Sequence, residues 1–350
     1  MRTNHELKQR RRLNECLIRC ATLGMLAMSS IACATPRRTA PPAIYTLVPS
    51  AYGMELKTPD GRVIFVYMTK KPENIGLTSP STACFYPVNT PSGERVTSIA
   101  PNDHPHHRGI FLGWQNSEFH EPVDVSTMGP HHPIRALKIT RTDFWGWGQY
   151  APRDGRVIVT KEIKLIDADA EHATLAIHND WMVDNRKMLE EDDRVSVKEQ
   201  EGVFVIDLDY HLAPIADYVL NQSGFGGFAL QGRKDGESYY ANAAGKVTMP
   251  DPHYAYPESD WPDAPWYDFT IQLKDSGKIV GAAVINSTSN PETTWHNASY
   301  LWMLNPSITG DGPYTIHPKS PLELQYRVVV HDGPTPTSLL EKLTTEWMSR

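Results

Sequence analysis

Short runs of β-branched, aromatic and aliphatic residues recur along the chain from about residue 45 onward, separated by glycine, proline and polar turn residues. Runs of this kind are typical of β-strands, and two of them follow Asp-Gly pairs, which are a hairpin signal. The predicted strands lie at residues 63–67, 110–114, 157–159, 171–181, 203–212, 278–285 and 322–330. The pattern therefore predicts a protein built mainly from β-strands.

The C-terminal segment and the content of proline and glycine indicate the fold class and the domain limits. The segment from Pro336 to Leu343 begins as a helix does, with Ser and Thr residues available to cap it. Many short strands, with 28 prolines and 23 glycines in the chain, are typical of a large antiparallel β-sandwich or barrel. We expect residues 45–350 to form one all-β domain with a short C-terminal helix, preceded by a flexible tether at residues 35–44.

Residues 1–34 have the organisation of a signal peptide. A basic region leads into an apolar stretch at residues 21–31, and Ala32, Cys33 and Ala34 follow. Cleavage after Ala34 would give a periplasmic or secreted protein, whereas lipidation of Cys33 would give an outer-membrane lipoprotein. No apolar run of about 20 residues follows, so we expect no transmembrane helix in the mature chain.

Charge and cysteine content narrow the range of partners. Removing residues 1–34 takes away six of the 34 Lys and Arg residues and two of the 41 Asp and Glu residues, which changes the net charge from −7 to −11. An acidic chain of this kind is not expected to bind nucleic acid. Cys84 alone of the four cysteines lies beyond the leader, so we predict no intrachain disulfide.

The densest group of reactive side chains directly precedes the strand predicted at residues 110–114. It consists of His104, His106, His107 and Arg108. Three imidazoles can transfer protons at neutral pH or bind a divalent metal ion, and a guanidinium can hold an anion in a cleft. We therefore predict a catalytic site here. A metal-bound form would be completed by His211, Asp209 or His296.

A second group of polar side chains alternates along the strand predicted at residues 203–212. Asp207, Asp209 and His211 share one face of this strand, opposite a face of apolar side chains. Two carboxylates and an imidazole could supply the acid and the base of a catalytic site. The same residues could equally form an ordinary solvent-facing strand surface.

Aromatic and polar residues in the second half of the chain suggest a place for a sugar, because flat aromatic rings stack on sugar faces. The candidate substrate-binding residues are Arg233, Trp261, Trp266, Trp295 and His296. The aromatic members could instead fill the core beneath a long loop. Both readings remain open at this point.

Several stretches of the sequence resemble a bacterial family labelled PmoA-like, or "methane oxygenase PmoA". They are residues 104–114, residues 289–291 with Trp295, residues 304–307 and residues 326–333, within a resemblance that spans about residues 45–345. The resemblance implies a secreted β-rich protein, similar to enzymes and binding proteins of sugar metabolism, with a galactose mutarotase-like supersandwich. The family label implies a metal-dependent oxygenase as a further alternative.

Together these features predict an exported carbohydrate-active protein with a small-molecule or oligosaccharide substrate. Our first hypothesis is an enzyme that transfers protons as a lyase, epimerase or hydrolase, and the alternative is a non-catalytic carbohydrate-binding protein. An enzyme needs an acid and a base within reach of one substrate. The two hypotheses therefore differ in whether the histidine cluster and the acidic strand face meet in one pocket.

Overall fold

The structure is a computed structural model, and it describes residues 43–123, 136–148, 154–248, 261–298 and 300–349. By backbone contacts the chain divides into residues 1–41 and residues 42–350, and every described residue belongs to the second unit. The predicted leader with Cys33, and the predicted tether except for residues 43 and 44, lie outside the described residues. None of the described helical segments is long and apolar enough to cross a membrane.

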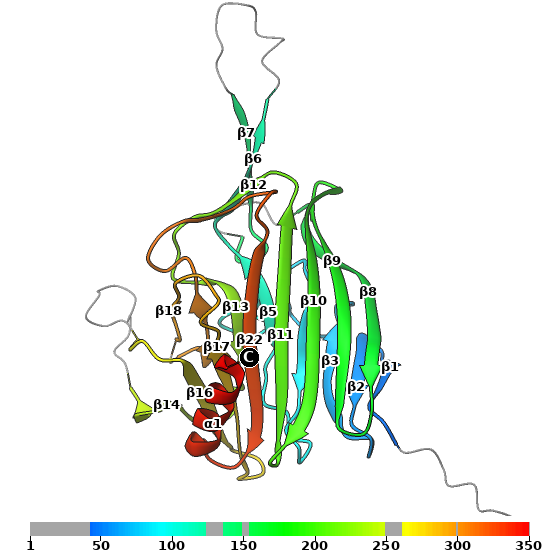
Figure 1. Cartoon of the computed structure of the whole chain (residues 1–350), viewed down its shortest axis with the longest axis vertical. Coiled ribbons are helices and arrows are strands. Elements are labelled where there is room, and N and C mark those ends of the chain that lie inside the picture. Colours follow the sequence, from blue (N-terminus) through cyan, green and yellow to red (C-terminus); the bar gives the residue numbers. More distant parts are fainter. Residues whose placement is uncertain (1–42, 124–135, 149–153, 249–260, 299, 350) are drawn as a thin grey trace, which may run out of the picture. The chain divides into compact units, whose positions relative to one another are not determined.

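Nine antiparallel strands form the largest sheet, which includes the long strands drawn in green in Figure 1. In spatial order they are β15 (Gly245–Val247), β14 (Gly236–Asn242), β16 (Trp266–Leu273), β17 (Ile279–Asn286), β22 (Leu322–Asp332), β11 (Val203–Pro214), β10 (Arg186–Gln200), β9 (His172–Val183) and β8 (Arg156–Ala168). This sheet contains five of the strands predicted from the sequence, at residues 157–159, 171–181, 203–212, 278–285 and 322–330.

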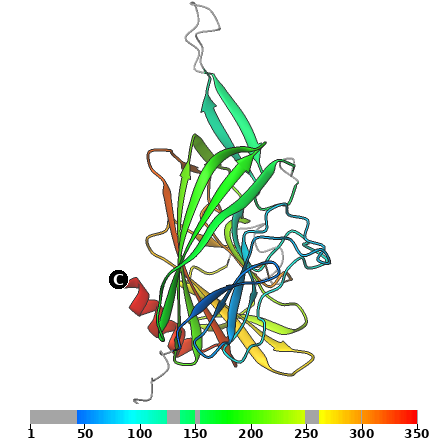
Figure 2. The ribbon, with the colours of Figure 1, turned by 90° about the vertical axis from the view of Figure 1, so that its right-hand side faces the viewer.

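A second sheet of seven strands packs against the first, and Figure 2 shows its first strands, in blue, beside the long green strands. Its order is β1 (Thr46–Pro49), β2 (Gly53–Lys57), β3 (Val63–Met68), β4 (Cys84–Val88), β5 (Ile110–Trp114), β13 (Gly226–Gln231) and β19 (Met303–Leu304). Smaller sheets contain β21 (Tyr314–Ile316), β12 (Asp217–Leu220), β6 (Ser117–Pro122) and β7 (Leu137–Thr142), and β18 (Thr294–Trp295) with β20 (Pro306–Ser307).

One hydrophobic core joins the two large sheets. Phe65 in β3 belongs to the same buried cluster as Leu208 in β11. The rings of Phe228 in β13 and Tyr326 in β22 stack with their centroids 4.2 Å apart, so side chains from both sheets interdigitate. Face-to-face packing of this kind defines a sandwich. The predicted antiparallel all-β sandwich is therefore confirmed.

The helix α1 (Thr337–Met348) covers part of the outer face of the nine-stranded sheet, in front of β16 and β17 and beside β22 (Figure 1). Its Leu340 and Leu343 pack with Val205 of β11 and Val329 of β22. Around Val205 and Val329 both faces of these two strands are thus buried, the inner face by the core and the outer face by α1. The predicted C-terminal helix is confirmed, and its apolar stripe explains where it packs.

The start of α1 differs from the sequence prediction. Pro336 occupies the N-cap position, and no side chain caps the helix there. The nearby Thr335 hydroxyl donates instead to the carboxylate of Asp268, at 2.6 Å, in the sheet beneath. Pro336 has no N–H group, so it suits this end of a helix without a side-chain cap. The prediction of a Ser or Thr cap is wrong because that hydroxyl ties the helix to the sheet.

Two carboxyl groups of β10 point into the core. Glu191 and Asp193 are buried, and Asn179 of β9 donates to Glu191 at 2.7 Å. The Trp181 indole N–H also donates to Glu191. Burial, followed by the charge of Glu191 and a hydrogen bond with it, raises the pKa of Asp193 well above its usual value. Two close carboxyl groups in a dry core cannot both ionise easily, so the protonated form is favoured for this pair.

This carboxyl pair predicts a pH dependence of stability. An unfolded carboxyl group has a pKa near 4, roughly, whereas burial raises the folded pKa of Asp193 and Glu191 above that value. The stabilisation that the protonated pair gives the folded protein is complete below the unfolded pKa. It is lost as pH rises through the pKa values of the folded state. We expect the free energy of unfolding of Asp193→Asn to fall less than that of wild type as pH rises. Urea denaturation at several pH values measures this, and equal pH dependence in both chains would contradict it.

Candidate functional site

Tight backbone turns position the three histidines before strand β5. The amide of His104 donates to the carbonyl of Pro101, and the amide of His107 donates to the carbonyl of His104, both at 3.0 Å. Gly109 then adopts a φ of 52° and passes so close to Phe85 that a Cβ would lie 2.1 Å from its carbonyl oxygen. Only glycine fits there, and the chain enters β5 from a fixed direction.

The three imidazole rings lie together. The ring centroids of His106 and His107 are 4.5 Å apart, those of His104 and His107 are 5.1 Å apart, and those of His104 and His106 are 5.7 Å apart. His106 and His107 are buried, whereas His104 is partly exposed. The sequence prediction that these residues form one cluster agrees with this geometry.

A small pocket of about 100 Å³ adjoins the imidazoles. It is lined by the three histidines and by aromatic and apolar side chains from three other segments: His104, His106, His107, Trp145, Trp147, Phe225, Tyr300 and Leu301. Trp147 stacks on His106, with 5.9 Å between the ring centroids and 15° between the planes. Tyr300 lies 6.2 Å from His104 and is 44% exposed, which makes the outer wall aromatic as well.

A buried carboxylate shapes the loop that carries the two tryptophans. Asp143 accepts hydrogen bonds from the backbone N–H of Gly146, at 2.7 Å, and of Gly148. The loop turns tightly at Gly146, which has a φ of 98°. This arrangement holds Trp145 in the core beside His107 and presents Trp147 to the pocket.

Gln231 fixes the tautomer of His107. The Gln231 amide nitrogen donates to the carbonyls of Gly232, at 3.0 Å, and Leu301, at 2.6 Å, so its amide oxygen faces the imidazole. That oxygen lies 2.7 Å from His107 Nδ1, which must therefore carry the proton. The other ring nitrogen, Nε2, keeps its lone pair and can accept a proton or bind a metal ion.

Burial also keeps this imidazole neutral. The pKa of His107 lies well below its usual value, chiefly because burial penalises the charged ring and secondly because His106 lies close by. Burial lowers the pKa of His104 too, although the nearby carboxylate of Asp103 acts in the opposite direction. At neutral pH the His107 imidazole is therefore uncharged, as a general base must be before it takes a proton.

Arg108 does not face this pocket. Its guanidinium is fully buried and donates to the carbonyls of Trp145, at 2.9 Å, and Phe144, at 3.3 Å. It also lies 4.3 Å from the ring centroid of Phe111. Burial lowers the pKa of Arg108 to about 10. The prediction that Arg108 reaches into a cleft to hold an anion is wrong, because its hydrogen bonds are used to fix the loop that carries the tryptophans.

The acidic face of β11 does not reach the imidazoles either. Asp207 receives two hydrogen bonds from Arg327, at 2.6 and 2.8 Å, beneath α1. Asp209 lines a groove beside the same helix, and His211 pairs with Glu323 on the neighbouring strand. Because the apolar face of β11 points into the core, these polar side chains point outward. The assignment of these three residues to the histidine site is therefore wrong.

The predicted sugar-stacking tryptophans lie in the core. Trp261 and Trp295 belong to the main hydrophobic cluster, and Trp266 packs under α1. Each is at most 5% exposed, so none offers a free ring face to a sugar. Of the two readings of these tryptophans, filling of the core is the correct one, because strand alternation and the loop before β16 turn them inward.

The two polar candidates beside these tryptophans also have structural contacts. Arg233 is buried and forms a two-pronged ion pair with Asp235, which raises the pKa of the guanidinium. His296 is buried, and its Nε2 lies 2.8 Å from the hydroxyl of Thr294. Its ring lies 6.5 Å from that of Phe225, behind the pocket wall. The prediction that these two residues bind substrate directly does not agree with this placement.

The sequence interpretation missed most of the pocket wall. Trp145 and Trp147 stand in the segment Asp143–Gly148, where two Trp-Gly pairs follow an aspartate and a phenylalanine. Closely spaced glycines are a turn signal, and this one could have indicated a tight loop that carries both tryptophans. Gln231 gives no such signal, because nothing in its local sequence reveals a partner 124 positions away.

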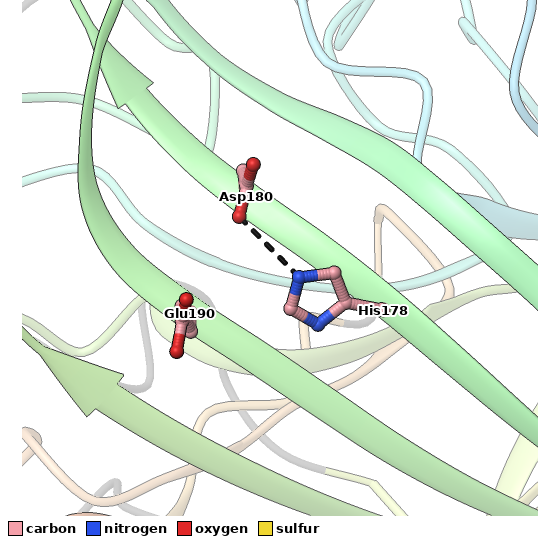
Figure 3. Close-up of side chains that lie close together, drawn as sticks. All are labelled: His178, Asp180 and Glu190. Atoms are coloured by element: carbon pink, nitrogen blue, oxygen red, sulfur yellow. Dashed lines mark ion pairs between the residues drawn. The ribbon is translucent and has the colours of Figure 1, made fainter.

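Metal-ligand geometry occurs elsewhere in the described part of the chain. There, the group of three His, Cys, Asp or Glu side chains whose ligand atoms all lie within 4.8 Å of one another consists of His178, Asp180 and Glu190 (Figure 3). The three pocket imidazoles are not such a group. The predicted divalent metal at the histidine cluster therefore stays a prediction without support from the distances.

Solved structures with a similar chain path include carbohydrate enzymes. One is a galactose mutarotase related enzyme from Lactobacillus acidophilus, with 6% identity, a TM-score of 0.35, and 82% of this chain and 97% of that chain covered. A GH36 alpha-galactosidase from Geobacillus stearothermophilus in complex with raffinose has 9% identity, a TM-score of 0.36, and coverages of 82% and 40%. The galactosidase domain of an alpha-galactosidase-sucrose kinase has 8% identity, a TM-score of 0.35, and coverages of 83% and 41%.

The amino-acid sequence matches one protein family. No curated protein matches the chain. Residues 57–345 match a family described as "Family of unknown function (DUF6807)". The match includes the histidine cluster, the tryptophan loop and all but the last turn of α1.

Proposed function

Because the chain belongs to the DUF6807 family of unknown function over residues 57–345, we propose its function from the chemistry of the pocket. We propose that it is a carbohydrate-active enzyme that holds one sugar unit in the pocket and transfers a proton with His107. One observation carries the proposal: three imidazoles and a stacked indole line the same pocket, and Gln231 holds His107 as a neutral base.

The wall of the pocket suits a sugar. Sugar rings present C–H groups on their faces and hydroxyl groups at their edges, which match aromatic rings and imidazole nitrogens respectively. Trp147, Phe225 and Tyr300 supply the rings. The cavity of about 100 Å³ is well below the roughly 300–1,000 Å³ of common ligand sites, so we expect it to accept the end of a glycan or a monosaccharide.

The reaction that this arrangement supports is proton transfer. His107 Nε2 would take a proton from a sugar carbon, or from a water molecule that attacks the anomeric carbon in a hydrolase. His104 or His106 would give a proton to the leaving oxygen, or to the opposite face of the carbon in an epimerase. Such chemistry belongs to a lyase, an epimerase or a hydrolase. The positions of the two neighbouring rings, within 5.1 Å of His107, put acid and base beside one substrate.

A second candidate, a non-catalytic carbohydrate-binding protein, has one observation in its favour. Among the described residues that line the pocket there is no carboxylate, and the acidic face of β11 lies elsewhere. A protein that only binds a sugar needs the aromatic wall and hydroxyl-binding nitrogens, and no acid–base pair. In either case we propose export, by cleavage after Ala34 or as a lipoprotein through Cys33.

Variants of the pocket distinguish the two candidates. We expect Trp147→Ala to weaken sugar binding by about tenfold, because a stacked aromatic contact contributes roughly 1 kcal/mol or more. We expect His107→Gln to lower turnover by about 100-fold or more while sugar still binds. A screen of monosaccharides, oligosaccharides and 3-keto-sugars by calorimetry and by product analysis provides both measurements.

The controls use residues outside the pocket. Trp261→Phe changes a buried ring of the core and is expected to leave sugar affinity unchanged. Sugar binding without any product, in wild type and in His107→Gln alike, would support the binding protein over the enzyme. Binding that is unaffected by Trp147→Ala would refute both candidates at this pocket.

A further inference from the structure

The outer face of the β9–β10 hairpin carries a cluster of side chains of the types that bind metal ions. These residues have no part in the proposed reaction. His178 and Asp180 are two residues apart in β9, so they share a face, and Glu190 of β10 pairs with Asp180 in the antiparallel register. The ligand atoms of these three side chains lie within 4.8 Å of one another. Figure 3 shows His178 turned toward Asp180, with Glu190 on the adjacent strand.

A fourth residue orients the imidazole. Asp192 pairs with His178 in the strand register, and its carboxylate oxygen lies 2.7 Å from His178 Nδ1. A carboxylate can only accept this hydrogen bond, so Nδ1 carries the proton and Nε2 is the nitrogen that faces Asp180. A carboxylate that holds one nitrogen of a histidine while the other binds a metal ion is the common outer arrangement of zinc sites.

Asp180 lies at the centre of this cluster. The residue is only 9% exposed, and its Oδ1 accepts no hydrogen bond at normal length, although the Lys187 ammonium lies 3.6 Å away. This oxygen lies 3.5 Å from His178 Nε2. A buried carboxylate oxygen that accepts no hydrogen bond at normal length is incompletely satisfied. A cation between Asp180 Oδ1 and His178 Nε2 would supply that missing partner.

The spacing also fits a metal ion. Zinc bonds to histidine nitrogen and carboxylate oxygen are about 2.1 Å long, and two such ligands in a tetrahedron lie roughly 3.4 Å apart. The observed 3.5 Å between His178 Nε2 and Asp180 Oδ1 matches that value. An imidazole with two carboxylates favours zinc and related transition metals over calcium, which prefers oxygen ligands alone.

Two lysines now partly compensate the acidic charges. Lys187 Nζ contacts Glu190 and lies 3.6 Å from Asp180 Oδ1, and Lys161 Nζ lies 3.9 Å from Asp180 Oδ2. The two ammonium groups face three carboxylates, including that of Asp192, so one negative charge remains. Because the Lys187 side chain is 38% exposed, it can turn to solvent when a metal ion takes its place.

From this geometry we propose that the outer face of β9 and β10 binds a divalent transition-metal ion such as Zn²⁺. His178 Nε2, Asp180 Oδ1 and the Glu190 carboxylate are the protein ligands, and water completes the coordination. Asp192 is a positioning residue that fixes the imidazole. Lys187 competes with the ion for the same carboxylates. The proposal is independent of the sugar pocket.

Titration of the full chain with Zn²⁺ tests the proposal, using protein made without a histidine tag and stripped with chelator. We expect one ion to bind per chain by calorimetry, and His178→Ala to lower its affinity by more than about tenfold. Asp192→Ala is expected to weaken binding by about 10–100-fold. Lys187→Met is expected to strengthen it, because the competing ammonium group is removed.

His172→Ala is the matched control, because His172 also lies on β9 beside two carboxylates. Its two ring nitrogens are each 3.0 Å from a carboxylate oxygen, of Asp167 and Asp169 respectively, and its side chain is 43% exposed. We expect this variant to bind Zn²⁺ as wild type does. Absence of stoichiometric binding by wild type, equal binding by His178→Ala, or loss of binding in His106→Ala instead would each overturn the proposal. Circular dichroism of each variant checks that the fold is intact.

Discussion

Replacing Arg108 with alanine is expected to lower the free energy of unfolding by about 3–5 kcal/mol, because the substitution empties a buried site and removes the donors of several carbonyl groups. The guanidinium bonds to the carbonyls of Phe144 and Trp145 and packs on Phe111. Urea denaturation followed by tryptophan fluorescence measures the change. Arg108→Lys should also destabilise, since an ammonium group cannot reach both carbonyls in the geometry of the planar guanidinium.

The control for this prediction is Arg141→Ala, which removes a guanidinium whose side chain is 76% exposed. We expect its effect to stay within about 0.5 kcal/mol. If Arg108→Ala left the urea midpoint unchanged and abolished turnover of a sugar substrate, Arg108 would act in the pocket, and the anion-clamp hypothesis taken from the sequence would hold.

Replacing Asp207 with alanine is expected to cost about 3–5 kcal/mol as well, for an electrostatic reason. Arg327 is fully buried beneath α1 and donates two hydrogen bonds to Asp207 and one, at 2.9 Å, to the carbonyl of Leu343. Removing the carboxylate leaves a buried cation without its counter-charge, which is the costly way to break such a pair. Thermal or urea denaturation gives the size of the loss.

Two further variants separate charge from packing in this region. Asp207→Leu combined with Arg327→Met removes both charges, and we expect it to regain much of the stability, because apolar residues often replace buried ion pairs well. Asp209→Ala, two residues along the same strand face, is the control with a small expected effect. Equal losses for Asp207→Ala and Asp209→Ala would argue against the ion pair as the cause.

The sheets were largely predictable because strand alternation is local. In β11 the run from Val203 to Leu212 places Phe204, Ile206 and Leu208 on one face, and that face is the one in the core. The same pattern could not show that α1 covers the other face, because this contact joins residues more than 100 positions apart. A strand whose polar face meets solvent and a strand whose polar face forms a buried ion pair beneath a helix have similar sequences.

The candidate site was predictable in part. Histidines at positions 104, 106 and 107 are close in sequence, so their proximity in space follows from the local backbone. Whether the adjoining Arg108 faces solvent or core depends on Phe144 and Trp145, which come from another segment. In the sequence, a tryptophan that stacks on a sugar cannot be distinguished from one that fills the core. Only the packing of the sheets shows that Trp261, Trp266 and Trp295 are buried.

Strand β10 carries acidic side chains on both of its faces, with Glu191 and Asp193 directed inward and Glu190 and Asp192 outward. A shift of its pairing by one residue would exchange the two faces. Such a slip would substitute acid for acid in the middle of the strand, yet it would also expose Val195 and Val197 and bury Arg194. An unpaired guanidinium in the core is far less tolerable than a carboxyl group that can take up a proton. Arg194, together with Val195 and Val197, therefore favours the native pairing of β10 over the pairing shifted by one residue.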